Sequence, residues 1–222
     1  MRLGRVLRRA AHEERGLTLV ELMMATALLS LVLAASSAAL ASYQRTAASS
    51  DVRLENLTEA QAIMDVVSRD IRTATRPPQQ ASESPFLVAG ANEVRFYANL
   101  RTTTGAKLVR LYVDSGTGRV IEEAIEPAGA APYTYTSAPV VRVVGRHFAN
   151  GPGQPLLTYL NDQGVEIGNV LTAPLTADQR LQIDAVRIKL SIRKSTSLNV
   201  RPTTVVTTVR LPNVDYTPVT TA

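Results

Sequence analysis

The sequence contains an unusually long stretch without a helix breaker, from residue 17 to residue 76. All 12 prolines lie at or after Pro77, and no glycine occurs between Gly16 and Gly90. Proline and glycine are the residues that most often interrupt a helix. One continuous helix, roughly 90 Å long at 1.5 Å per residue, is therefore allowed. Because a small domain is only about 30 Å across, part of such a helix must leave the domain that it belongs to.

The first part of this stretch is strongly apolar. Residues 17–41 contain a single charged side chain, that of Glu21, and this length is sufficient to cross a hydrocarbon core as a helix. Residues 1–16 carry five Arg and two Glu, and an excess of positive charge holds such a flank in the cytoplasm. We therefore expect a single-pass protein of the cytoplasmic membrane, with its N-terminus inside and everything after Ala41 outside the cytoplasm.

Composition excludes several classes of function. The chain has no cysteine, which excludes disulfides and thiolate metal sites, and only one of its two histidines, His147, lies beyond residue 16. A catalytic triad would have to be built on His147, which lies in Gly145-Arg146-His147-Phe148, and no nucleophile-elbow pattern accompanies it. Residues 1–16 supply +3 of the formal charge of +5, so the remainder gives little support for binding a polyanion. We expect no enzymatic activity, no cofactor and no metal site.

Glu21 is the most unusual residue of the apolar stretch. A carboxylate inside an apolar helix costs roughly 2.5 to 3.5 kcal/mol, so it indicates a function that involves a partner group. If the chain is cut after Gly16, Leu17 acquires a charged amine near the depth of Glu21 in its own subunit and in neighbouring subunits. The two charges would then neutralise each other and hold subunits in register. The alternative is a carboxylate that extends to the membrane interface, since Glu21 is only about one turn into the helix.

The segment Gly16-Leu17-Thr18-Leu19-Val20-Glu21-Leu22, with basic residues before it and an apolar helix after it, resembles the class III signal of type IV pilins and type II secretion pseudopilins. The resemblance implies cleavage after Gly16 by a prepilin peptidase, N-methylation of Leu17, and an assembly role for Glu21. Leu17 departs from the phenylalanine that the family more often has at this position. Methylation acts on the backbone amine and tolerates other side chains.

Residues 42–76 are predicted to continue the helix as an amphipathic segment. The apolar residues at spacings of three and four, which places them on one stripe of a helix, are Leu57, Ala60, Met64, Val67, Ile71 and Ala74. The charged residues, Asp70 among them, are expected on the other faces. The stripe either covers a sheet of the following domain or packs neighbouring subunits; we favour the first, because a domain built from strands needs a cover. Thr75-Arg76-Pro77-Pro78 is expected to end the helix.

Residues 77–222 show the alternating pattern of strands and predict a β-rich head outside the cytoplasm. The predicted strands are Glu93 to Leu100, Lys107 to Asp114, Arg119 to Glu126, Pro139 to Val144, Leu156 to Leu160, Asp184 to Ile192 and Thr203 to Leu211. The segments Asp114 to Gly118 and Asn161 to Gly164 are predicted to be turns. The expected fold class is α+β, with the long N-terminal helix packed on a mainly antiparallel sheet.

The strand from Asp184 to Ile192 alternates apolar side chains with the basic side chains of Arg187, Lys189 and, just beyond it, Arg193. We interpret the basic side as an ordinary solvated sheet face, and the alternative is a patch that contacts an acidic partner or DNA. This strand and the next, which ends near Asn213, resemble the C-terminal pair of J-type minor pseudopilins and related minor pilins.

These observations divide the chain into a basic leader that is cleaved (1–16), a transmembrane and assembly helix (17–41), its amphipathic continuation (42–76) and the head (77–222). The resemblance implies a minor pilin or pseudopilin subunit. Its implied partners are the prepilin peptidase, other pilin or pseudopilin subunits and the inner-membrane assembly platform. A secretion pseudopilus, an adhesive or motile pilus and a DNA-uptake pilus share this N-terminus, and only the last would involve nucleic acid.

Two competing hypotheses make different predictions. A membrane-anchored binding domain that never assembles would keep its Arg-rich leader and tolerate replacement of Glu21 by alanine. A secreted β-domain released by signal peptidase near Ala41 would begin in the Ala-Ser tract and be free of the membrane.

Overall fold

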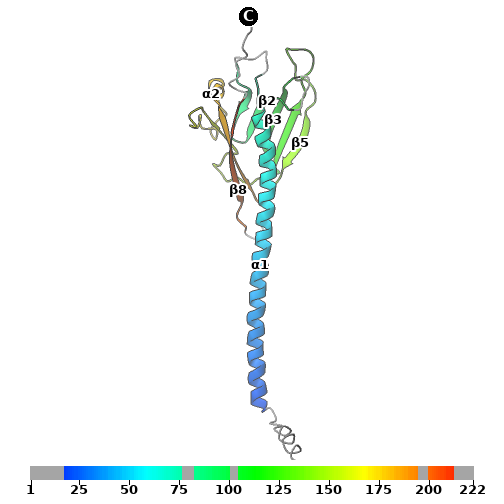
Figure 1. Ribbon diagram of the computed structural model, residues 1–222, viewed down its shortest axis with the longest axis vertical. Coiled ribbons are helices and arrows are strands. Elements are labelled where there is room, and N and C mark those ends of the chain that lie inside the picture. The colour runs from blue at the N-terminus through cyan, green and yellow to red at the C-terminus, as the bar shows by residue number, and fades with distance from the viewer. Residues whose placement is uncertain (1–17, 77–82, 101–104, 195–199, 213–222) are drawn as a thin grey trace, which may run out of the picture. The chain divides into compact units, whose positions relative to one another are not determined.

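The structure is a computed structural model that describes residues 18–76, 83–100, 105–194 and 200–212. The chain divides into two compact units, residues 1–48 and residues 49–222. One helix, α1 (Leu19–Arg72), belongs to both units (Figure 1). The predicted long helix is therefore confirmed, and the uninterrupted run without glycine or proline explains its length.

α1 ends four residues before the predicted end at Arg76. The hydroxyl of Thr73 donates to the carbonyl of Asp70 at 2.7 Å, and the amide of Thr75 donates to the carbonyl of Tyr97 at 2.9 Å. The chain thus leaves the helix to pair with a strand before it reaches the prolines. Tertiary pairing, and not the Pro-Pro dipeptide, sets the helix end.

The second unit contains two antiparallel sheets. The first has the strand order β1-β2-β3-β4-β5, and the second has the order β6-β7-β8. The strands of the first sheet are β1 (Phe86–Ala89), β2 (Glu93–Ala98), β3 (Lys107–Asp114), β4 (Arg119–Ile125) and β5 (Val140–Gly145). Those of the second sheet are β6 (Leu157–Leu160), β7 (Ala185–Ile192) and β8 (Thr203–Arg210). A short helix, α2 (Ala177–Leu181), precedes β7. The predicted α+β class with antiparallel sheets is confirmed.

All seven predicted strands exist, and their bounds differ from the prediction by at most two residues. Two elements were missed. β1 is a run of four residues with no readable period, and α2 is only five residues long. The signal for α2 was present, because Thr176 and Gln179 form a capping box in which each side chain bonds the other residue's amide.

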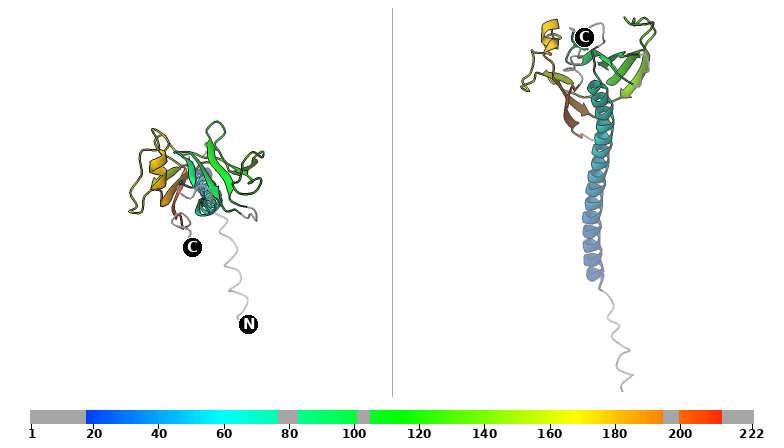
Figure 2. Two further views of the ribbon diagram at one scale, coloured as in Figure 1. Left: turned by 90° about the horizontal axis from the view of Figure 1, so that it is seen from above. Right: turned by 45° about the horizontal axis from the view of Figure 1, so that its top comes forward.

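Within the second unit, the later part of α1 is covered by both sheets. Figure 2 shows the two sheets on either side of this part of the helix. The stripe residues Ala60, Met64, Val67 and Ile71 are buried, which confirms that the stripe packs on the head. Leu57 is 36% exposed, so its predicted place in the core is wrong, while the unpredicted Ile63 is 1% exposed. The core therefore lies between helix and sheets.

Backbone and side-chain bonds join the two sheets. The buried hydroxyl of Tyr159 in β6 donates to the carbonyl of Gly90, in the turn between β1 and β2, at 3.1 Å. The amide of Leu157 donates to the carbonyl of Ala91 at 2.9 Å. Burial raises the pKa of Tyr159 well above its ordinary value, so this hydroxyl stays protonated and keeps its donor role.

Both predicted turns are confirmed. The amide of Gly118 donates to the carbonyl of Asp114 at 2.8 Å, and the amide of Gly164 donates to the carbonyl of Asn161 at 2.9 Å. Both glycines have positive φ, 62° and 76°, a conformation that glycine adopts without a steric penalty. The turn after β3 is therefore a hairpin and not a phosphate loop.

Candidate functional site

The described part of the first unit, residues 18–48, is a helical segment with its apolar side chains exposed. The large hydrophobic side chains from Leu19 to Tyr43 are between 55% and 76% exposed. Successive positions such as Leu22, Met23 and Met24 point to different faces, so the segment is apolar all round. By length and composition α1 is able to cross a membrane. An apolar surface of this extent needs lipid or protein around it.

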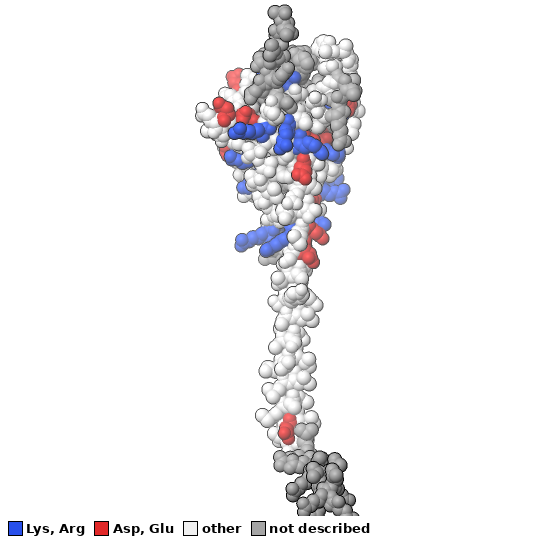
Figure 3. All heavy atoms as spheres, viewed as in Figure 1, with Lys and Arg blue, Asp and Glu red and all other residues white. Residues whose placement is uncertain are grey.

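Glu21 lies in the first turn of α1, and its side chain is exposed. The hydroxyl of Thr18, just before the helix, accepts from the amide of Glu21 at 3.2 Å and so caps the helix start. Glu21 is the sole charged residue between Thr18 and Gln44. Figure 3 shows this part of the helix as an almost entirely uncharged surface. The other two predicted site residues, Gly16 and Leu17, lie outside the described residues.

The predicted basic residues lie on one side of the second sheet. Val186, Ile188, Leu190 and Ile192 of β7 are buried, which confirms that the apolar side of this strand faces the core. On the other side, Arg187 is paired with Glu166 at 2.8 Å. Lys189 is half-buried, and Arg193 lies one residue beyond β7 and is exposed. Ser191, which shares this side, is buried, and its hydroxyl bonds that of Thr204 at 2.8 Å, so this side of the strand is not solvated throughout.

His147 lies just after β5 and has a positive φ of 59°. Its Nδ1 lies 3.1 Å from a carboxylate oxygen of Glu59 in α1, and the other oxygen of Glu59 accepts from the amide of Arg146 at 3.0 Å. His147 therefore lies at a strand end. Its contact with the helix could not be read from the sequence, since Glu59 is 88 positions away.

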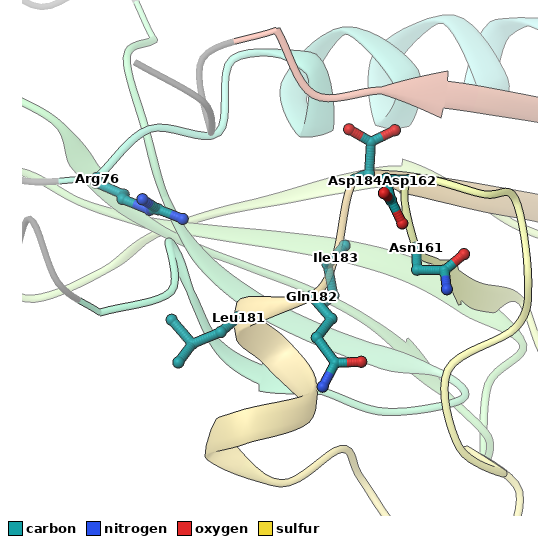
Figure 4. Close-up of a pocket in the computed structure, with 7 residues that line it drawn as sticks. All are labelled: Arg76, Asn161, Asp162, Leu181, Gln182, Ile183 and Asp184. Carbon is teal, nitrogen blue, oxygen red and sulfur yellow. The ribbon is translucent and has the colours of Figure 1, made fainter. Parts of the chain in front are cut away.

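A cavity of about 290 Å³ lies beside α2 (Figure 4). Its lining residues are Arg76, Asn161, Asp162, Leu181, Gln182, Ile183 and Asp184. Figure 4 shows these seven side chains around the cavity. Among the described residues no group of three or more acidic or histidine side chains could hold a metal ion.

An ionic cluster with two buried carboxyls and a half-exposed guanidinium occupies the contact between α1 and the first sheet. It consists of Asp70 in α1, Glu122 in β4 and Arg142 in β5. Arg142 forms a close ion pair with Glu122, its cross-strand neighbour, and lies 3.7 Å from a carboxylate oxygen of Asp70. Asp70 is only 2% exposed. The sequence predicted Asp70 on a face other than the apolar stripe and gave no sign of its burial; Arg142, distant in sequence, offsets part of the cost of burying it.

Burial raises the pKa of Asp70 to about 7, and the nearby negative charge of Glu122 adds to the increase. The positive charges of Arg142 and Arg69 act in the opposite direction but do not cancel it. The hydrogen bond to Glu122 in turn raises the pKa of Arg142, so this guanidinium stays charged. The negative charges of the two carboxyl groups are thus balanced mainly by one half-exposed guanidinium, that of Arg142.

The family model of the prokaryotic N-terminal methylation motif matches residues 12–37. The motif supports a type IV pilin-like protein. The matched segment contains all three predicted processing and assembly residues, Gly16, Leu17 and Glu21, together with the first turns of the exposed apolar helix. No curated protein and no solved structure matches the chain. The motif and the apolar helix together fit a pilin-like protein that is anchored in a membrane, processed by a prepilin peptidase and able to assemble.

Proposed function

We propose that this chain is a minor pilin or pseudopilin subunit that is cut after Gly16 and assembled into a type IV pilus or a type II secretion pseudopilus. The observation that carries the proposal is the coincidence of the matched methylation motif with the exposed apolar half of α1. A short anchor would need neither the motif nor a helix that continues for 54 residues. The proposed role is structural, without a catalytic step.

Assembly is proposed to proceed by transfer of the apolar segment from lipid to the interior of a helical fibre. In lipid the side chains from Leu19 to Tyr43 are already in an apolar environment, so association depends on packing and on polar contacts. The small residues between positions 34 and 42 allow helices to approach closely. Glu21 supplies the polar contact, because its carboxylate would pair with the methylated amine of Leu17 in a neighbouring subunit.

The proposal is tested by replacing Glu21 with glutamine, which keeps the size of the side chain and removes its charge. We expect the variant to enter the membrane and to be processed normally, but its incorporation into fibres to fall at least ten-fold. The matched control is Asp51→Asn, which makes the same chemical change at an exposed position of α1 beyond the apolar segment. Incorporation of the Glu21 variant at the control level would refute the pairing mechanism.

A second experiment separates assembly from simple anchoring. Gly16→Leu is expected to block processing and leave the precursor in the membrane. If the uncut precursor still supports every activity of the native protein, the chain is a membrane-anchored binding domain and the proposal is wrong.

A further inference from the structure

β5 is attached to α1 through three groups on one side of the helix, which we call the α1–β5 seam. Glu59 contacts His147, just after β5, at 3.1 Å. Ile63 packs against the backbone of Gly145 so closely that a Cβ on that glycine would lie 2.1 Å from its Cδ1. Asp70 approaches Arg142 at 3.7 Å. The helix positions are four and seven residues apart, which keeps all three on one face.

β5 depends on this seam because it is the last strand of its sheet. Among the strands that the structure describes, it pairs with β4 alone. Val140 and Val141 are 67% and 58% exposed, so the start of the strand gains little from burial. Any change that weakens the seam should therefore loosen β5 before it affects the central strands.

The charges at the end of the seam are unequally matched. Glu122 has a close ion pair with Arg142, whereas Asp70 is too far from Arg142, at 3.7 Å, for a good hydrogen bond. Arg69, the other nearby cation, lies 3.7 Å from the second oxygen of Asp70, and its side chain is 58% exposed. Among the described residues no donor reaches Oδ2 of Asp70, which is buried. A buried acceptor without a donor is unfavourable.

Binding of one proton by the two carboxyls would remove this imbalance between negative and positive charge. Asp70 and Glu122 both approach the same guanidinium nitrogen, Nη2 of Arg142, so their carboxyl groups lie close to each other. Two ionised carboxylates cannot bond one another, but a protonated one donates to its neighbour. With one proton present, the two buried carboxyls carry one negative charge between them, which the half-exposed guanidinium of Arg142 balances.

We propose that Asp70 and Glu122 share a single proton at neutral pH and below, and that release of this proton weakens the α1–β5 seam and loosens β5. The groups around this proton are two buried carboxyls, one from α1 and one from β4. Two cations face them, Arg142 from β5 and Arg69 from α1. This proposal is independent of the proposed function.

The direction of the pH effect follows from the pKa of Asp70, about 7 in the folded chain against 3.8 without the fold. Because the folded pKa is raised, the contribution to stability is complete below about pH 4 and is lost as the pH rises through 7. Loss of one proton with this pKa shift raises the equilibrium constant for opening of the seam by at most about fifty-fold between pH 5 and pH 7.

The test is hydrogen exchange, followed by mass spectrometry, on the full chain in detergent micelles at pH 5 and pH 7. Protection factors corrected for intrinsic exchange are compared for the β5 amides and the β7 amides. We expect protection of β5 to fall about fifty-fold from pH 5 to pH 7, and that of β7 to fall less than five-fold. An equal fall in both strands would show that the proton governs global unfolding and would overturn the proposal.

Three variants test which carboxyl groups bind the proton. Asp70→Asn mimics the protonated form and should reduce the pH-dependent fall at β5 to less than about three-fold. Glu122→Gln removes the neighbouring negative charge but leaves Asp70 buried, so it should reduce the fall only in part, which keeps the test valid if the first variant does not fold. Asp65→Asn, an exposed position of the same helix, should retain the full dependence. Retention of the full dependence in both Asp70→Asn and Glu122→Gln would refute the shared proton.

Discussion

The contact between Ile63 and Gly145 makes a sharp prediction about stability. Replacing Gly145 with alanine adds one methyl group, which would lie 2.1 Å from Cδ1 and 2.2 Å from Cγ1 of Ile63. Rotation of the terminal methyl alone cannot relieve both contacts, and a β-branched residue in a helix has little freedom at χ1. Ile63 is 1% exposed and surrounded by core residues, so it has nowhere to move.

We therefore expect Gly145→Ala to destabilise the chain by about 2 kcal/mol, within the range of roughly 1 to 3 kcal/mol for overpacked cores. The assay is urea unfolding of the full chain in detergent micelles, followed by circular dichroism of the β-rich unit. The matched control is Gly151→Ala, because a Cβ at Gly151 would meet nothing closer than 3.9 Å. That change should alter the free energy of unfolding by less than about 0.5 kcal/mol.

A double-mutant cycle tests the physical cause. Ile63→Ala removes both atoms that clash with the added methyl group, although alone it should cost about 2 to 5 kcal/mol through the cavity that it leaves. In the Gly145→Ala background it should cost at least about 1 kcal/mol less, because it also relieves the overlap. Additivity within about 0.3 kcal/mol would refute the close approach of β5 to α1.

Two further substitutions test the joints between elements, with the same unfolding assay. Tyr159→Phe should destabilise by about 1 kcal/mol, because the buried carbonyl of Gly90 loses its donor, and no change would contradict that bond. Asn56→Ala should cost about 1 to 3 kcal/mol, because the amide of Lys194 loses the side-chain oxygen that accepts from it at 3.0 Å; a stabilising effect would show that this contact has no role.

The sequence was sufficient for most of the secondary structure. The absence of glycine and proline from residues 17 to 76 predicted α1, and alternation predicted the seven longer strands, because both signals are local. β1 was missed since its four residues Phe-Leu-Val-Ala carry no period, and the end of α1 was misplaced since Tyr97 determines it. Periods report which face is apolar, and they do not report which distant residue pairs with it.

The candidate functional residues also divide into those that a local signal predicts and those that depend on distant contacts. Glu21 could be predicted because its charge contrasts with the residues next to it in the sequence. Asp70 and Asn56 could not, because each is a polar residue on a helix whose burial is made tolerable by groups far along the chain. Arg142 pairs with Asp70 across 72 positions, and Lys194 with Asn56 across 138. Only the arrangement of the two sheets around α1 brings these groups together.

The central claim is that the chain is a processed, methylated subunit of a pilin-like assembly. The most direct test is mass spectrometry of the intact protein and of its N-terminal peptide from the native membrane fraction, with the prepilin peptidase present and deleted. The account predicts a chain that starts at methylated Leu17 when the peptidase is present and at Met1 when it is absent. A start at Met1 in both strains, or a start near Ala41, would contradict it.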